Sequence, residues 1–325
     1  MANEQGIIHA TTILGNGSGT IIADNEISEV VHSDQLSWLH MDATNPNARV
    51  WLEKELSYLD HIILDALTAE ETRPRILEFG EGVLMILRGV NLNQDAQPED
   101  MVSIRVWIDK DRIVSLERRN LKAVGDILQR LKTQAGPKNS GDFATMLVAR
   151  LFERMEPVLT ELDEAADTIE ESVMENPGPE QRSDINMIRK QAILFRRYMA
   201  PQRDVIARLR TTEMVWLDIQ HRRRLQESLD HVTRYVEDLD AIRERAQIIK
   251  DELVSALSDR LNHNMYILSV VAATFLPLGF LTGLLGINVG GIPGADNPSA
   301  FLIFIGILIA ISAAQIWIFK KKKWF

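Results

Sequence analysis

The residues of this sequence that could do chemistry are oxygen and imidazole ligands, because the chain of 325 residues contains no cysteine. The absence of cysteine excludes thiolate metal sites, disulfides and cysteine nucleophiles. The sequence also has no P-loop, dinucleotide-binding fingerprint or nucleophile elbow. We therefore expect neither an enzyme nor a bound cofactor, and any metal ion must be held by oxygen or nitrogen atoms.

A weakly polar face follows one hydrophobic segment near the C-terminus. Its members recur at alternating spacings of four and three, so they share one side of a helix. They are Asn262, Met265, Ser269, Ala272, Leu276, Gly279 and Gly283. Such a face is typical of close helix packing, and it also fits a pore with room for water and a hydrated ion. The spacing leaves both interpretations open.

Gly286, Ile287 and Asn288 follow that face directly, in a loop rich in glycine. Moving a bare divalent ion from water into a medium of low dielectric constant costs on the order of tens of kcal/mol. The ion must therefore keep its hydration water or bind replacement oxygen atoms along its path. Asn288 offers an amide oxygen, which is a neutral ligand. Tight zinc sites use imidazole or thiolate, and this loop has neither. We therefore expect Gly286–Asn288 to be a selectivity loop at the mouth of a pore, where the ion keeps most of its hydration water.

The acidic and histidine residues lie outside the apolar segments, which contain no Asp, Glu or His. A proton relay would therefore have to use His263, at the inner end of the weakly polar face, or residues further back along the same helix. The further candidates are His221, His231, Asp251, Glu252 and Asp259. Asp259 and His263 are also the candidate metal ligands.

Two apolar runs, 265–285 and 300–319, each have about 20 residues, which is enough to cross a bilayer. Arg260 precedes the first run and Lys320–Lys323 follow the second. By the positive-inside rule both flanks are cytoplasmic, so we expect a multi-pass protein with both termini in the cytoplasm. The formal net charge of −10 argues against a nucleic-acid partner.

The preceding chain is predicted to carry these spans on a long helix. Apolar residues recur at near-heptad spacing from Leu225 to Ala256, which favours packing against other helices or against copies of the same helix. The expected segments are a cytoplasmic α/β domain (1–135), an acidic and basic helical hairpin (136–217), a stalk helix continuing into the first span (218–285), a periplasmic loop (286–299), the second span (300–319) and a basic cytoplasmic tail (320–325). Strands are expected within 6–14, 36–41, 83–90, 102–108 and 112–116.

The segment Phe275–Asn288 resembles the end of the first membrane helix in CorA-type metal ion transporters, which carry Gly-Met-Asn there. This sequence has Ile287 in place of the methionine, and Val-Gly-Gly follows where Mg²⁺-transporting members usually carry an acidic residue. Together with the segments 71–75 (ETRPR) and 196–204 (RRYMAPQRD), it is similar to the zinc-transporting branch of that family.

The resemblance implies a funnel-shaped homopentamer in the bacterial inner membrane, in contact with lipid, with a central pore ringed by Asn288 at its outer mouth. It further implies transport of Zn²⁺, and of Cd²⁺, Ni²⁺ or Co²⁺, with uptake coupled to protons. Two spans per chain cannot enclose a water-filled path, so transport requires oligomerisation.

Two alternatives remain at this point. The first is a channel for Mg²⁺ or Co²⁺ of the same family, without proton coupling. The second is a membrane-anchored scaffold or signalling protein, whose spans serve only as an anchor.

Overall fold

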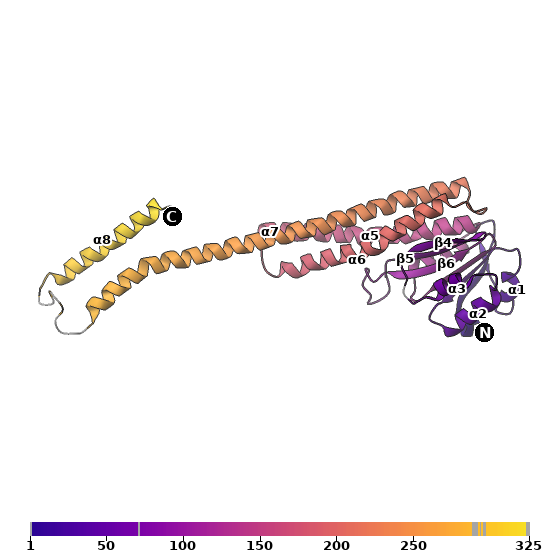
Figure 1. Cartoon of the computed structure of the whole chain (residues 1–325), viewed down its shortest axis with the longest axis horizontal. Helices are drawn as coiled ribbons and strands as arrows, with labels where there is room; N and C mark the ends of the chain where they lie inside the picture. Colours follow the sequence, from indigo (N-terminus) through magenta and orange to yellow (C-terminus); the bar gives the residue numbers. More distant parts are fainter. Residues whose placement is uncertain (1, 71, 288–291, 293, 295–296, 323–325) are drawn as a thin grey trace. The chain divides into compact units, whose positions relative to one another are not determined.

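The computed structural model describes residues 2–70, 72–287, 292, 294 and 297–322. The chain divides into two compact units (Figure 1). The first comprises Met1–Asn176 and Glu180–Lys250, and the second comprises Pro177–Pro179 and Asp251–Phe325. The α/β part and the helical hairpin both belong to the first unit.

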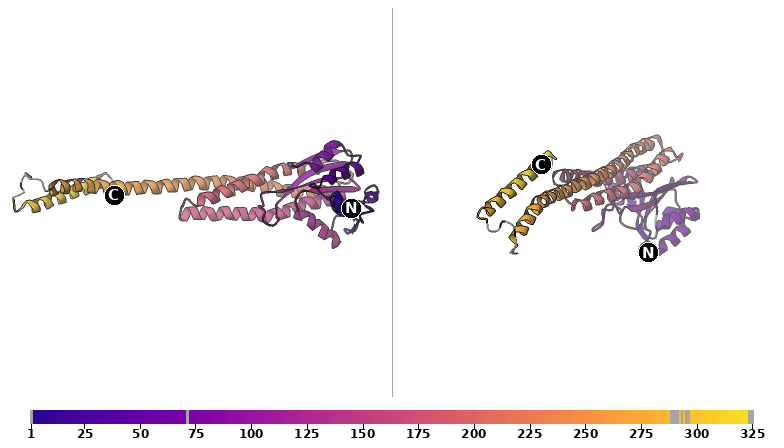
Figure 2. Two further views of the ribbon diagram at one scale, coloured as in Figure 1. Left: turned by 90° about the horizontal axis from the view of Figure 1, so that it is seen from below. Right: turned by 60° about the vertical axis from the view of Figure 1, so that its left-hand side comes forward.

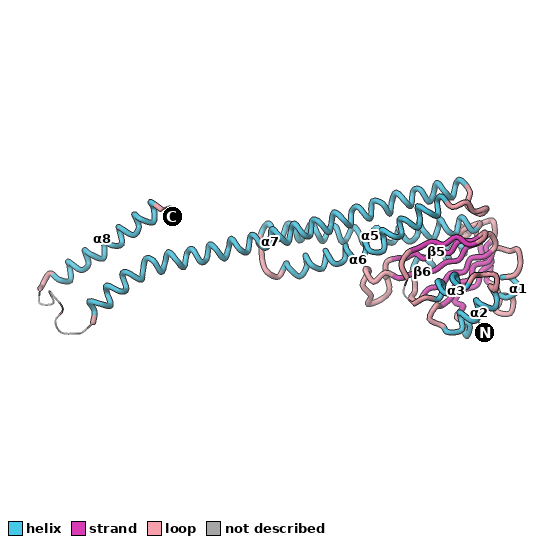
Figure 3. Tube along the Cα trace, viewed as in Figure 1, coloured by secondary structure: helices cyan, strands magenta, loops and turns pink. Residues whose placement is uncertain are grey.

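A seven-stranded sheet forms the α/β part, in the order β2-β1-β3-β7-β6-β5-β4 (Figure 3). The strands are β1 (Ile7–Ile13), β2 (Gly19–Ile21), β3 (Ser37–Asp42), β4 (Arg75–Phe79), β5 (Gly82–Gly89), β6 (Val102–Ile108) and β7 (Arg112–Glu117). Only β3 and β7 pair in parallel; the other neighbours among these strands are antiparallel. The five predicted strands are confirmed, whereas β2 and β4, which form the two edges, were not predicted.

Short helices cover one face of the sheet: α1 (Ile27–Val31), α2 (Pro46–Glu55) and α3 (His61–Thr68), preceded by a 3-10 turn at Ala2–Gln5. Leu52 and Leu67 from these helices are fully buried in one cluster with Leu84 and Leu116 of the sheet. Asn45 and Asp60 cap α2 and α3 through side-chain oxygens that accept backbone N–H groups. Apolar burial therefore holds this layer in place.

Longer helices follow the sheet: α4 (Lys122–Lys132), α5 (Ser140–Glu175) and α6 (Gln181–Thr211). Phe143 of α5 packs edge-on against Trp38 of β3, with ring centroids 4.8 Å apart, on the sheet face opposite α2 and α3. The predicted turn at Asn176–Pro179 separates α5 from α6, which form the helical hairpin.

The helix α7 (Ile219–Gly286) has 68 residues and confirms the predicted stalk that continues into the first span. In the first unit it lies beside α5 and α6 (Figure 2), where Arg245 forms ion pairs with Asp167 and Glu170 of α5 and Arg196 of α6 binds Asp240. The last helix, α8 (Ala300–Lys321), follows in the second unit. Both α7 and α8 contain stretches long and apolar enough to cross a membrane.

Candidate ion pathway along helix α7

The weakly polar face lies on the part of α7 that belongs to the second unit. Six of its seven residues are exposed in the single chain: Asn262, Met265, Ser269, Leu276, Gly279 and Gly283. Ala272 is half-buried. Met265 and Leu276 are 62% and 70% exposed, so this face of α7 has no partner within the described chain.

A different face of α7 meets α8. The half-buried residues of α7 in this stretch include Val270, Ala273, Thr274, Leu278 and Leu281. On α8 the covered side chains recur at helical spacing, at Phe304, Leu308, Ile311, Ser312, Gln315 and Phe319. The residues of α7 that α8 covers therefore form a stripe beside the weakly polar face, of which only Ala272 is half-buried.

Glycine is not required at the weakly polar face by any contact within the described chain. A Cβ added at Gly279 or Gly283 would have no atom within 4 Å. The hydroxyl of Ser269 donates to the carbonyl of Met265 at 2.8 Å, so its hydrogen is used inside the helix. The face thus offers small side chains and few strong ligands, as a path for a hydrated ion requires.

Pro277 interrupts the hydrogen bonding of α7 within the first span. Proline has no N–H, so the carbonyl four residues earlier, that of Ala273, loses its helical donor. Gln315 of α8 donates its side-chain Nε2 to that carbonyl at 3.2 Å. In a membrane, where water cannot replace the missing donor, this bond satisfies the backbone. Sequence reasoning missed Gln315, although it is the only amide side chain in the apolar run 300–319.

The selectivity loop is described only in part. Gly286 is the last residue of α7, and Ile287 is 50% exposed. Asn288 lies outside the described residues, so its assignment stays a prediction.

The two candidate metal ligands, Asp259 and His263, lie one helical turn apart on α7 and are exposed. Within the described ranges no group of three or more His, Asp or Glu side chains could hold a metal ion. The geometry of one chain therefore provides at most two ligands here, so a site at this level would need further chains. His221, another candidate, is buried instead, with Nε2 3.3 Å from Asp142 Oδ1 on α5.

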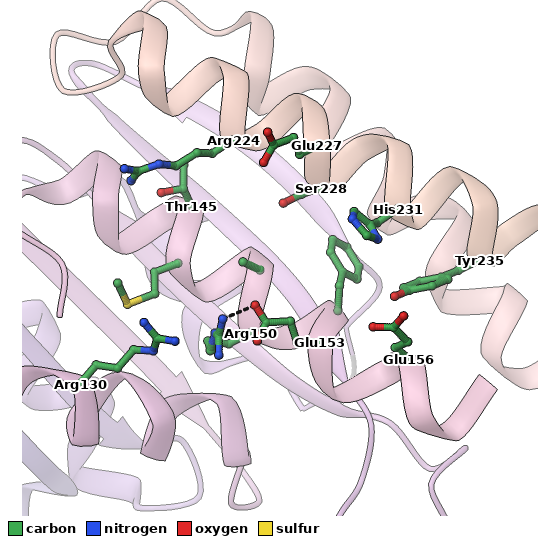
Figure 4. A pocket seen from close by; sticks show the side chains of 13 residues that line it. Arg130, Thr145, Arg150, Glu153, Glu156, Arg224, Glu227, Ser228, His231 and Tyr235 are labelled. Atoms are coloured by element: carbon green, nitrogen blue, oxygen red, sulfur yellow. Dashed lines mark hydrogen bonds and ion pairs between the residues drawn. The ribbon is translucent and has the colours of Figure 1, made fainter. Parts of the chain in front are cut away.

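A pocket of about 400 Å³ lies between α4, α5 and α7 in the first unit (Figure 4). Three arginines (Arg130, Arg150 and Arg224) and three glutamates (Glu153, Glu156 and Glu227) line it, and Arg150 is paired with Glu153. His231 and Tyr235 contribute from α7. Burial, and then the charge of Glu156, raise the pKa of Tyr235 to about 12, so its phenol stays protonated. The balanced charges argue against a cation site in this pocket.

Comparison with known proteins identifies the architecture. The sequence model of the family described as "CorA-like Mg2+ transporter protein" matches residues 33–321. The zinc transport protein ZntB of Pectobacterium atrosepticum is 38% identical over 98% of this chain and 96% of its own length. The divalent cation transporter CmaX of Pseudomonas aeruginosa is 36% identical over 99% of this chain and 98% of its own.

A solved structure of a related protein has the same fold. The structure of the full-length CmaX protein superposes with a TM-score of 0.86 at 36% identity, over 98% of both chains. The resemblance inferred from Phe275–Asn288 and the predicted fold class, an α/β domain followed by a long helix and two apolar helices, are thereby confirmed. The chain belongs to the CorA-like Mg²⁺ transporter protein family.

Proposed function

We propose that this chain is the subunit of a homo-oligomeric membrane transporter for divalent cations, with Zn²⁺ as its main ion. The observation that carries the proposal is the exposed weakly polar face of α7, which is separate from the stripe that meets α8. Copies of α7 arranged around an axis would turn these faces toward one another. A water-filled path with small, neutral walls would result.

The preference for zinc is supported by the relatives. The protein named for zinc transport and the protein named for divalent cation transport both match this chain over nearly its full length. The residues after Asn288 include no acidic side chain before Asp296, which fits the zinc-transporting branch better. Cd²⁺, Ni²⁺ and Co²⁺ belong to the same proposal because a neutral path discriminates weakly among hydrated divalent ions.

The assembly and orientation follow from the same argument. We place both termini in the cytoplasm of the inner membrane, since cationic residues flank the ends of both spans nearest the termini. A pentamer is the proposed assembly. Asp259 and His263 of each subunit would then form rings where the path meets the cytoplasm, and His263 is the proposed proton carrier because imidazole is the side chain best suited to exchanging protons in physiological conditions.

A Mg²⁺ or Co²⁺ channel without proton coupling is the second candidate, favoured by the description of the matching family. Reconstitution into liposomes separates the two. Entry of Zn²⁺ and of Mg²⁺ is followed with ion-selective dyes, with and without an imposed pH gradient. Faster Zn²⁺ entry with the interior alkaline supports proton-coupled zinc uptake, and Mg²⁺ entry that ignores the gradient supports the channel.

A further inference from the structure

A cluster of arginines occupies one end of the sheet in the first unit, far along the chain from the spans. These side chains line a cavity of about 710 Å³ bounded by the loop before β4, by β5 and β6, and by α6. Its arginines are Arg73, Arg88, Arg118, Arg119 and Arg197. Three carboxylates, those of Glu70, Glu99 and Asp100, line the same cavity. Positive charge therefore prevails locally, in a chain whose net charge is −10.

Strand register brings part of this cluster together. Arg88 on β5 is directly opposite Ser103 on β6, and paired residues of antiparallel strands project from the same face. Arg105 follows Ser103 by two residues and so projects from that face as well. Three neighbouring strands thus concentrate positive charge at one place on the sheet, since Arg118 comes directly after the end of β7.

A further arginine, Arg105, does not line the cavity but is close enough to Arg88 and Arg118 to be repelled by both, and its exposed fraction is 0%. Its Nη2 donates to the carbonyl of Ala69 at 2.7 Å, but its Nε and Nη1 have no hydrogen-bond partner in the described part of the chain. Burial, and then repulsion from Arg118 and Arg88, lower the pKa of Arg105 to about 10. A buried cation is normally paired with an anion that offsets the cost of removing it from water, whereas the charged neighbours of Arg105 are themselves cations.

The cavity wall is held in a fixed geometry. The Arg88 guanidinium lies 4.1 Å from the centroid of the Tyr198 ring and donates to the carbonyls of Thr72 and Met101 at 2.7 Å each. Gln202 bonds both backbone groups of Arg88, at 2.6 and 3.1 Å, which fastens β5 to α6. Preorganised guanidinium groups of this kind suit planar or tetrahedral oxyanions.

Further groups at the same cavity also favour an anion. The hydroxyl of Thr72 is buried and has no hydrogen-bond partner among the described residues. Arg197 extends over the same Tyr198 ring, 5.7 Å from its centroid. The carboxylate beside Arg118 is exposed: Glu70 is 88% exposed and lies 3.8 Å from Arg118, a distance and exposure that give little stabilisation.

We propose that this cavity is a binding site for the phosphate group of a small anionic molecule, held by Arg88, Arg118 and Arg197. Binding places two or more negative charges beside Arg88 and Arg118, the two cations that repel the buried Arg105. The volume lies within the range of small-molecule sites, roughly 300 to 1,000 Å³, and is large enough for a phosphorylated metabolite as well as for free phosphate.

The test measures binding of ATP and of inorganic phosphate to the purified full-length protein by isothermal titration calorimetry, with EDTA present to remove divalent cations. Saturable binding of either anion is expected. Binding of phosphate alone shows that the phosphate group suffices, and binding of ATP alone shows that the rest of the molecule contributes.

Variants locate the site. Arg197→Gln removes one exposed arginine of α6 and is expected to weaken binding about tenfold, the loss of one charge-assisted hydrogen bond. Arg208→Gln is the matched control, because Arg208 is an exposed arginine of the same helix that pairs with Glu78 instead. Equal affinity in the two variants would overturn the proposal, as would the absence of saturable binding of both anions.

A thermal readout complements the titration. Arg105→Met removes the buried charge and is expected to raise the melting temperature of the anion-free protein and to make the further rise on adding ATP smaller than in the unaltered protein. Should Arg105→Met fail to fold, Arg197→Gln still decides the matter, because its side chain is exposed.

Discussion

Gln315 of α8 donates its side-chain amide to the carbonyl of Ala273 at 3.2 Å, and that carbonyl is the one that Pro277 deprives of its helical partner. The two spans are therefore joined by a hydrogen bond at the point where α7 lacks one of its own backbone hydrogen bonds. A proline permits a bend in α7 there, and the glutamine of the neighbouring helix bonds the backbone carbonyl that lacks a helical donor.

A double-mutant cycle tests this relationship. We expect Gln315→Leu to reduce stability by about 1 kcal/mol, because the Ala273 carbonyl is then unsatisfied in an apolar medium. In a Pro277→Ala background the same substitution should cost clearly less, since an alanine at that position restores the helical N–H. Unfolding in detergent micelles gives both values, and identical costs in the two backgrounds would refute the link.

The ion pair between α4 and α5 predicts a pH dependence. Arg154 donates to both carboxylate oxygens of Asp126 at 2.6 Å, and this hydrogen bonding lowers the pKa of Asp126 below its usual 3.8. A carboxyl whose pKa is lower in the folded than in the unfolded chain stabilises the fold at any pH above the unfolded pKa. This contribution is lost as the pH falls below about 3.8.

Asp126→Asn should accordingly lower the free energy of unfolding by about 1 kcal/mol at neutral pH, since both side chains are partly exposed. The difference from the unaltered protein should shrink steadily below pH 3.8. Melting temperatures measured from neutral pH down to about pH 3 supply the comparison. A difference that stays constant down to the lowest pH would contradict the assignment.

Ser115 is predicted to be the most sensitive polar position of the sheet. Its hydroxyl, fully buried, lies 2.8 Å from Trp38 Nε1 and 2.8 Å from His40 Nδ1. Ser115→Ala leaves the indole N–H without its acceptor and should cost about 1 to 3 kcal/mol. Thr160→Ala is the control, because that exposed hydroxyl bonds only the carbonyl one turn back; equal losses in both variants would argue against the network.

The loop residues yield a prediction about ion flux. Asn288→Ala should reduce Zn²⁺ entry about tenfold or more, because the amide oxygen that orders the water of the entering ion is lost. Ile287→Met, which restores the methionine of the resembled motif, should leave the rate of Zn²⁺ entry intact and change the ratio of Zn²⁺ to Mg²⁺ entry. Dye-based flux in liposomes measures both, and an unaltered rate in Asn288→Ala would remove that residue from the pathway.

The sequence predicted those elements whose pattern of apolar residues lies within one continuous segment. The central strands and the long helix carry regular apolar periodicity, so they were predictable. The edge strand β4 was not, because it is short, follows Pro74 and has only one buried residue. The weakly polar face was found from its spacing, and the choice between packing and pore for that face stays a prediction.

The remaining features depend on contacts distant in the sequence. The pairing of Gln315 with the carbonyl freed by Pro277 spans 42 positions from Ala273. The arginine cluster is likewise assembled by strand register and by α6 from separate segments. Neither the bond from Gln315 nor the arginine cluster produces a regular spacing of residues in the sequence. Composition and spacing alone therefore do not reveal them.

Zn²⁺ flux through two matched variants tests whether the weakly polar face of α7 lines the ion path. Gly279→Leu fills that face, whereas Gly306→Leu makes the same change on α8; an added Cβ has open space at both positions within the chain. With equal amounts of folded oligomer in liposomes, the account predicts that Zn²⁺ entry is abolished in Gly279→Leu and retained in Gly306→Leu. Retained entry in Gly279→Leu would contradict it.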